Sequence, residues 1–241
     1  MTMPAHIHAK DGDVADNVVI CGDPARVEAL SKLLDSRKVI NTNRGFLAYT
    51  GRFNGKIVTI ATHGIGQPSV AIVIEELAQL GAKNMIRLGT CGGLDPDLKV
   101  GDFAIATGAT YSYGGTVTQY IGASLSGLAL ATAPNFELTR RLAAELESMK
   151  VKFIFTNTYS SDSFYSLKDD MARELAAYGN KIVEMEVATL FMLGSIKKIK
   201  TASLLVVSDN VIKHTKLFSH EELEERVTLA GKAVLGAITK I

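Results

Sequence analysis

Apolar runs of strand length alternate with longer amphipathic or apolar stretches of helical length along most of the chain. Strands are expected at residues 18–21, 46–53, 56–62, 84–88, 103–111, 151–157, 182–183 and 201–207. Helices are expected after residue 23, at residues 68–80, 135–149 and 168–178, from about residue 186, and after residue 219. This alternation predicts an α/β fold with a mixed, mostly parallel sheet flanked by helices, in one domain over residues 1–241.

Turn and cap signals support several of these elements. The Asn54–Gly55 pair is typical of a tight β-hairpin between two of the expected strands. Ser219 and Glu222 have the spacing of a capping box for the last helix. The strand at 201–207 is almost entirely apolar, as expected where helices cover both faces of a sheet. In such a fold, ligands bind at the carboxyl ends of the strands.

Composition and charge exclude several classes of protein. The 241 residues include 26 Lys and Arg against 25 Asp and Glu, and this balance argues against a nucleic-acid binder. No apolar run approaches the roughly 20 residues that span a bilayer, and the first residues show no signal peptide. Cys21 and Cys91 are the only cysteines and form no CxxC pair, so a disulfide scaffold is not expected. This cysteine usage fits a reducing cytoplasm. With no metal-binding motif in the sequence, neither a metal nor an organic cofactor is expected.

Two arginines lie beside strand ends where a purely structural core would not need them. Gly22 ends the first strand, and Arg26 follows one turn into a helix whose free N–H groups favour an anion. The alternative is an ordinary capped helix with an exposed arginine. Arg87 lies inside an apolar strand and must be paired, either with an internal acid or with an anion bound at the glycine-rich turn expected after it.

Three acidic residues occupy comparable positions. Glu184 and Glu186 interrupt an apolar stretch, a pattern that suits glycosidase chemistry, a metal, or recognition of the two hydroxyls of a ribose. The alternative is one glutamate at a helix start and one exposed glutamate. Asp209 follows the apolar strand at 201–207, where burial would raise its pKa and suit a general acid, although it could simply begin a turn.

Several catalytic motifs are absent from the sequence. There is no GxSxG nucleophile elbow, no GxxxxGK[ST] phosphate loop and no HExxH zinc motif. His63 lies in a glycine-rich segment, but a histidine in such a place is more often a core or turn residue than a catalyst. These absences leave the arginines and carboxylates at the strand ends as the candidate chemistry.

Seven short motifs, in order, resemble the nucleoside phosphorylase I family, in particular its hexameric purine nucleoside phosphorylases and archaeal 5′-methylthioadenosine relatives. They are GDPAR at 22–26, NRG at 43–45, THGIG at 62–66, IRLGTCGG at 86–93, SDSFY at 161–165, VEMEVATL at 183–190 and VVSDN at 206–210. The match covers nearly the whole chain. It implies the three-layer α/β/α sandwich of that family and the reversible phosphorolysis of purine nucleosides to a free base and (deoxy)ribose 1-phosphate.

The resemblance also implies roles for individual residues. It places phosphate against Gly22, Arg26, Arg87 and Thr90, with Arg44 supplied by a neighbouring subunit. It places the nucleoside against His6 of a neighbour at the ribose 5′ end, Glu186 at the ribose hydroxyls, Met185 at the sugar, and Phe164, Val183 and Glu184 at the base. Asp209 would be the general acid at purine N7. Bacterial members assist this acid with an arginine, where this chain has Leu223, with Arg226 nearly a turn away.

The partners implied are a purine nucleoside, inorganic phosphate as co-substrate, and further copies of the chain in a homohexamer built as a trimer of dimers. Neither a nucleic acid nor a membrane is an expected partner. The alternative activities are a 5′-methylthioadenosine or uridine phosphorylase, a hydrolytic nucleosidase of the same fold, and a nucleoside-binding protein without catalysis. The arginines count against the hydrolytic enzyme, because water as the nucleophile does not need them.

Overall fold

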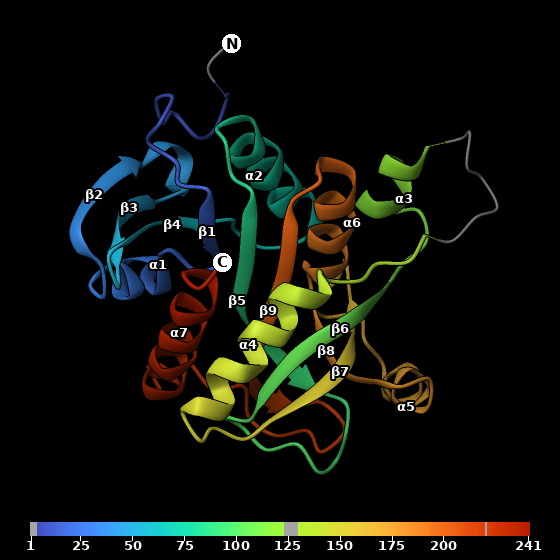
Figure 1. The fold of residues 1–241 in the computed structure, drawn as a ribbon. Coiled ribbons are helices and arrows are strands. Elements are labelled where there is room, and N and C mark those ends of the chain that lie inside the picture. The colour runs from blue at the N-terminus through green and yellow to red at the C-terminus, as the bar shows by residue number, and fades with distance from the viewer. Residues whose placement is uncertain (1–3, 123–129, 220) are drawn as a thin grey trace.

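The computed structural model describes residues 4–122, 130–219 and 221–241, and its strands form one mixed sheet (Figure 1). The strands are β1 (Asn17–Cys21), β2 (Asp35–Asn41), β3 (Ala48–Phe53), β4 (Lys56–Thr62), β5 (Asn84–Gly93), β6 (Phe103–Tyr111), β7 (Phe153–Ser160), β8 (Asn180–Glu184) and β9 (Lys200–Asn210). Their order is β2-β3-β4-β1-β5-β8-β7-β6-β9, and β9 also pairs with β5. Five of the nine pairings between the described strands are parallel, which confirms the expected mixed, mostly parallel sheet.

Strand β5 is the hub of this sheet. One of its edges pairs with β1 from Asn84 to Arg87 and with β8 only at Gly92 and Gly93. Its other edge follows β9 from Asn84 to Gly93, and because β9 also pairs with β6, strands β5 to β9 close into a small barrel. Residues 88–91 therefore lie where β1 and β8 separate, which opens the sheet beside Arg87.

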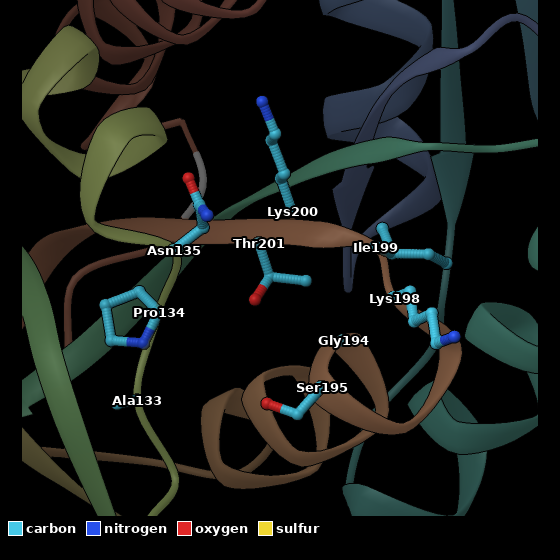
Figure 2. A pocket seen from close by; sticks show the side chains of 9 residues that line it. All are labelled: Ala133, Pro134, Asn135, Gly194, Ser195, Lys198, Ile199, Lys200 and Thr201. Atoms are coloured by element: carbon cyan, nitrogen blue, oxygen red, sulfur yellow. The ribbon is translucent and has the colours of Figure 1, made fainter.

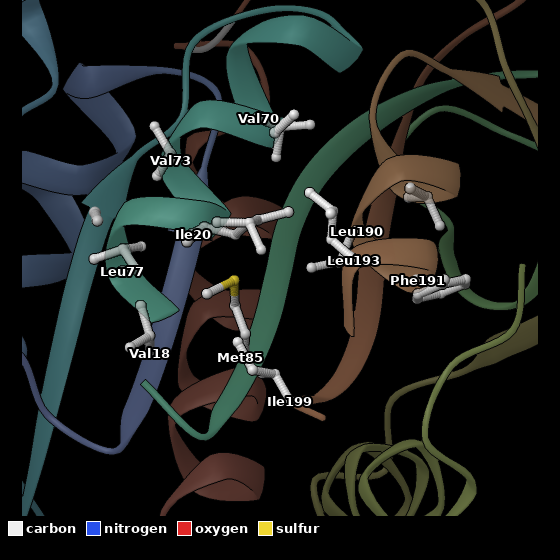
Figure 3. Packing of buried hydrophobic residues seen from close by; sticks show 14 of the residues in the cluster. Val18, Ile20, Val70, Val73, Leu77, Met85, Leu190, Phe191, Leu193 and Ile199 are labelled. Carbon is white, nitrogen blue, oxygen red and sulfur yellow. The ribbon is translucent and has the colours of Figure 1, made fainter. Parts of the chain in front are cut away.

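Helices cover both faces of the sheet (Figure 1). They are α1 (Pro24–Ser31), α2 (Gln67–Gln79), α3 (Thr116–Ile121), α4 (Phe136–Ser148), α5 (Asp169–Ala177), α6 (Val187–Lys197) and α7 (Glu224–Ile238). Helices α2 and α6 bury their apolar residues against one face, where Ile20 and Met85 of the strands pack with Leu77 and Leu193 (Figure 3). Helices α1, α4 and α7 form a second apolar cluster on the other face. The three-layer arrangement is confirmed.

The hairpin signal is confirmed in the structure, and the capping-box hydrogen bonds form, but they do not cap α7 itself, whose N-cap is Leu223. Asn54 and Gly55 have φ values of 49° and 77° and join the antiparallel strands β3 and β4. The backbone N–H of Ser219 donates to Oε2 of Glu222 at 2.7 Å, and the Glu222 N–H donates to Oγ of Ser219 at 3.3 Å. This capping box precedes a short turn, and α7 itself begins at Glu224.

Three elements differ from the sequence expectation. The glycine-rich segment 89–93 is not a turn but the second half of β5, because β9 and β8 pair with it. Strand β2 was not expected, because its first five residues are exposed and lack an alternating pattern. The short helix α3 was not expected either. No helix within the described residues is long and apolar enough to span a bilayer.

Candidate functional site

A cluster of buried charged side chains lies beside the part of β5 where its pairing with β1 ends and its pairing with β8 has not yet begun. Arg87 is 4% exposed, its Nη2 donates to Glu186, and its Nη1 lies 3.7 Å from Oε2 of Glu184. Burial alone would lower the pKa of Arg87, but the two carboxylates raise it. Of the two alternatives open from the sequence, the described residues show the internal ion pair. The anion at Arg87 stays a prediction.

The two glutamates play different structural parts in this cluster. Glu184, at the end of β8, accepts hydrogen bonds from the backbone N–H groups of Glu186 at 2.7 Å and Val187 at 2.9 Å, so it holds the first turn of α6. Glu186 accepts from the backbone N–H of Gly66 at 2.7 Å and from Arg87. Burial raises the pKa of Glu184. Burial is also the largest single influence on the pKa of Glu186 and acts to raise it, but the charge of Arg87 and the hydrogen bonds from Gly66 and Arg87 together outweigh burial, so the net shift is downward.

Arg26 approaches the same cluster from the first turn of α1. It is 6% exposed and its Nη1 donates to the carbonyl oxygen of Leu88 at 3.4 Å, so the alternative of an exposed surface arginine is wrong. Gly22 lies at the entry to this helix, and a Cβ there would stand 3.0 Å from the carbonyl oxygen of Gly64. The missing side chain lets the backbone of β1 and the segment after β4 approach each other closely.

His63 is a buried core residue, as the sequence favoured, and it lies within electrostatic range of Glu186, Arg87 and Arg26. Its side chain is wholly buried, and its Nε2 lies 3.9 Å from the position that a Cβ on Gly22 would occupy. Burial lowers the pKa of His63 to about 3, so the ring is neutral near pH 7. The sequence signal was weak, because only the fold brings the segment after β4 against Arg87 and Glu186.

Several buried nitrogen atoms of the cluster have no hydrogen-bond partner among the described residues. They are Nε of Arg26, Nε and Nη1 of Arg87, and both ring nitrogens of His63. Buried polar groups are almost always satisfied by protein, water or ligand. Because most of these atoms are N–H donors and two belong to guanidinium groups, the arrangement is suited to binding an anion.

Asp209 lies near the opposite end of the site, close to the carboxyl ends of β5 and β9. Its Oδ1 accepts a hydrogen bond from Oγ of Ser208 at 2.9 Å and lies 3.5 Å from the position that a Cβ on Gly92 would occupy. Side chains of Val183 and Val211 flank that same position at 3.2 and 2.9 Å. The carboxyl group is half-buried, and burial raises its pKa, as the sequence argument expected.

Leu223 and Arg226, the two residues compared above with the family's assisting arginine, both have partners other than Asp209 among the described residues. Leu223 is 3% exposed and belongs to the apolar cluster beneath α7. Arg226 donates from Nε to the carbonyl oxygen of Gly101 at 2.8 Å, and its guanidinium group lies 4.3 Å from the centre of the Phe103 ring. Arg226 therefore contacts Gly101 and Phe103. The hydrogen bond described for the Asp209 carboxyl group comes from Ser208, not from Arg226.

Three other candidate residues lie outside the buried cluster. The ring of His6 is bonded to Glu76 of α2, and Arg44 is exposed on a short 3₁₀ turn (Asn43–Gly45) with φ of 53°. Phe164 is 60% exposed and packs edge-to-face on Tyr165. The other predicted residues lie on the elements that form the site: half-buried Thr90 on β5, half-buried Val183 on β8 and half-buried Met185 directly after it.

A separate cavity of about 340 Å³ lies between the start of α4 and the end of α6 (Figure 2). Its lining residues are Ala133, Pro134, Asn135, Gly194, Ser195, Lys198, Ile199, Lys200 and Thr201. None of the candidate residues lines it, so the charged cluster at β5 is the candidate site. Within the described ranges, no three side chains of His, Cys, Asp or Glu are grouped so that they could hold a metal ion.

Known proteins similar to this chain are nucleoside phosphorylases. The family model of the phosphorylase superfamily matches residues 16–241. A DeoD-type purine nucleoside phosphorylase of Bacillus cereus is 35% identical over 221 residues, which is 91% of this chain and 92% of that protein. The corresponding protein of Caldanaerobacter subterraneus is 34% identical over 212 residues, 87% and 89% of the two chains.

Two solved structures have the same fold. The chain resembles the purine nucleoside phosphorylase of Toxoplasma gondii in complex with immucillin-H, with a TM-score of 0.89, 26% identity and coverage of 100% of this chain and 96% of that one. It also resembles the uridine phosphorylase of Vibrio fischeri, with a TM-score of 0.88, 26% identity and coverage of 100% and 99%.

Proposed function

Because the chain belongs to the phosphorylase superfamily, we propose that it is a purine nucleoside phosphorylase that exchanges the base of a nucleoside for phosphate, reversibly. The products are a free purine and (deoxy)ribose 1-phosphate. The observation that carries this proposal is the buried cluster of Arg26, Arg87 and Glu186, in which both arginines have nitrogen atoms without a hydrogen-bond partner among the described residues. Arg87 lies on β5, which pairs with β9, the strand that carries Asp209. A role in the cytoplasmic salvage of purines is part of the proposal.

Arg26 and Arg87 are assigned to phosphate binding. Nη2 of Arg87 donates to Glu186, while its Nε and Nη1 have no hydrogen-bond partner in the described part of the chain, and Nη1 has only the 3.7 Å ion pair with Glu184. Arg87 can therefore bind a phosphate oxygen and keep its ion pair. Arg26, the backbone at Gly22 and the hydroxyl of Thr90 complete the phosphate site within one subunit. The two arginines hold the phosphate, whose negative charge stabilises the positive charge that develops on the sugar and which then forms the new bond to that carbon.

The sugar is assigned to Glu186, with Met185 against the ribose. Since Arg87 and Gly66 hold the Glu186 carboxylate and keep it charged, its remaining lone pairs can accept hydrogen bonds from the two ribose hydroxyls. Glu184 supports this arrangement through the backbone of the same turn. As the glycosidic bond breaks, the sugar gains positive charge, which this negatively charged residue stabilises.

The base is assigned to Asp209, with Phe164, Val183 and Glu184 nearby. Cleavage of the glycosidic bond leaves negative charge on the departing purine, and a proton or a strong hydrogen bond at N7 offsets it. Burial raises the pKa of half-buried Asp209, the direction that favours a proton donor at N7. No metal or organic cofactor enters these steps, since phosphate is the nucleophile.

The complete site is proposed to form between subunits of a homohexamer arranged as a trimer of dimers. His6 and Arg44 lie outside the buried cluster, yet they share one surface: Nδ2 of Asn43, next to Arg44, donates to the carbonyl oxygen of His6 at 3.0 Å. We assign this surface to the site of a neighbouring copy, with Arg44 at the phosphate and His6 at the ribose 5′ end. A fully active monomer in light scattering would contradict the assembly.

The decisive experiment is to incubate the protein with inosine, with and without phosphate, and to identify the sugar product. Ribose 1-phosphate formed only with phosphate supports the proposal. Free ribose formed in either condition would establish a hydrolytic nucleosidase, and binding without turnover would establish a binding protein. The same assay with guanosine, adenosine, 5′-methylthioadenosine and uridine tests the purine preference. Uridine is included because the uridine phosphorylase of Vibrio fischeri has the same fold.

A further inference from the structure

Glu76 of α2 is a buried carboxylate, and its side-chain hydrogen bonds among the described residues come from the N-terminal segment. It accepts hydrogen bonds from the backbone N–H of His6 at 3.0 and 3.2 Å and from that of Ile7 at 2.6 Å. Its Oε1 also lies 2.7 Å from Nδ1 of the His6 ring. Glu76 itself is 7% exposed. Two backbone groups and one ring nitrogen thus fix both the position and the orientation of His6.

The protonation state of this pair follows from the same contacts. Burial by itself would raise the pKa of Glu76, but the hydrogen bonds from the His6 ring and from the backbone of Ile7 and His6 lower it. An ionised carboxylate can only accept hydrogen bonds, so Nδ1 must carry the proton that it shares with Glu76. In a neutral ring the other nitrogen, Nε2, is then an acceptor.

The acceptor nitrogen is presented at a surface. The His6 side chain retains 23% of its exposure, and none of the hydrogen bonds among the described residues involves its Nε2. The Asn43 side chain donates a hydrogen bond to the His6 backbone and so holds it against the turn that carries Arg44. The Phe46 and His6 rings pack edge-to-face, with their centres 6.1 Å apart. This face carries both residues assigned above to a neighbouring copy's site.

We propose that Glu76 is a positioning residue that fixes His6 in the Nδ1–H tautomer, so that Nε2 accepts a hydrogen bond from the 5′-hydroxyl of a nucleoside bound to a neighbouring subunit. This inference rests on the proposed function and deepens it, because it selects substrates by their 5′ group. A 5′-hydroxyl is a donor and pairs with Nε2. A 5′-methylthio or 5′-deoxy group offers no donor and leaves Nε2 unpaired.

The first test is spectroscopic and does not depend on catalysis. The ¹⁵N shifts of the His6 ring, measured above pH 8 in the full-length protein, report which nitrogen carries the proton. The wild type is expected to show Nδ1–H. Glu76→Gln places an amide that can donate to Nδ1, and is expected to shift the ring towards Nε2–H. An Nε2–H tautomer in the wild type, or the same tautomer in both proteins, would overturn the assignment.

The second test compares inosine with 5′-deoxyinosine by kcat/KM. Glu76→Gln should lower the value for inosine about three- to tenfold, the effect of one neutral hydrogen bond, and leave that for 5′-deoxyinosine nearly unchanged. Glu75→Gln is the matched control: it makes the same acid-to-amide change one residue away, where the partner is Lys197 at 2.6 Å. This control should leave the ratio between the two substrates as in the wild type.

The outcomes separate this inference from the function on which it rests. Equal losses for both substrates in Glu76→Gln would mean that Glu76 only anchors the N-terminal segment, and an unchanged ratio would exclude recognition of the 5′-hydroxyl. If the wild type cleaves neither nucleoside in the presence of phosphate, the proposed function fails and the selection at the 5′ group fails with it. The ¹⁵N measurement still decides whether Glu76 sets the tautomer.

Discussion

The cluster around Arg87 and the surface around His6 are built on opposite principles. Arg87 and its carboxylate partners are about 5% exposed or less, and each is held by elements far apart in the chain. His6 and Arg44 are held from one side only, by Glu76 and Asn43, and their functional atoms face outwards. The cluster lies within one subunit and suits the groups proposed to bind phosphate and ribose. The outer surface is the part proposed to act in a neighbouring subunit's site, with Arg44 at the phosphate and His6 at the ribose 5′ end.

The difference is also one of electrostatics. In the buried cluster, desolvation strengthens each interaction and leaves any unpaired group costly, so removal of one member affects both folding and catalysis. At the exposed surface, water competes with each hydrogen bond, and a loss there costs little stability. Substitutions should therefore have large effects in the cluster and near Asp209, and small, substrate-dependent effects at the outer surface.

The largest effect is expected for Asp209→Ala with inosine as substrate. A positioned general acid contributes about 10²–10⁴-fold to the rate, which corresponds to roughly 3–5 kcal/mol. Asp209→Asn keeps the shape and a weak donor, so it should lose less. The control substrate is 7-methylguanosine, whose base departs without protonation at N7 and should be cleaved by Asp209→Ala nearly as fast as by the wild type. Equal losses for both substrates would show that Asp209 only shapes the pocket.

The second effect concerns phosphate and Arg87. Arg87→Lys keeps the positive charge but removes the guanidinium fork, so Glu186 and phosphate can no longer be held together. Hydrogen bonds between charged groups contribute about 1.5–3 kcal/mol, so kcat/KM for phosphate should fall roughly 10- to 150-fold. Arg226→Lys is the control, because Arg226 contacts Gly101 and Phe103. An unchanged KM for phosphate in Arg87→Lys would mean that Arg87 serves only the ion pair.

The amino-acid sequence predicts the cluster around Arg87 better than the surface around His6, because His6 and Arg44 are indicated only by the family resemblance. Arg87 and Asp209 were found because a charge inside or after an apolar strand is unusual. The pairing of Arg87 with Glu186 was open, because no local rule joins two residues 99 positions apart. The participation of His63 and the contacts of Glu76 were missed, since only the packing of β4 and α2 shows what these residues touch. Strand β2 was missed because its exposed residues lack an alternating pattern.

The third effect is on stability and concerns His63. Its pKa is about 3 in the folded protein because the ring is buried, against an ordinary value of 6.5. Between these values the unfolded chain binds a proton that the folded chain does not, so stability falls as pH falls below about 6.5. From pH 7 to pH 5 this amounts to about 2 kcal/mol. Urea unfolding should show a shallower pH dependence for His63→Gln than for the wild type, and parallel pH profiles would contradict the burial of a neutral ring.

The smallest effect, and the one that tests the separation of the two regions between subunits, is expected for His6→Ala. Loss of one neutral hydrogen bond should lower kcat/KM for inosine about three- to tenfold.

If His6 acts in a neighbour's site, mixed oligomers of His6→Ala and Asp209→Ala subunits contain sites with an intact Asp209 and an intact His6 from the partner. Co-expression, or unfolding and refolding together, should then raise the activity per His6→Ala subunit towards the wild-type value, although the added subunits are nearly inactive. The matched control adds subunits that carry both substitutions, which can donate no histidine and should give no gain. A gain with neither mixture would place His6 in its own subunit's site or outside the reaction, and the outer surface would then be part of the same subunit's machinery as the cluster around Arg87.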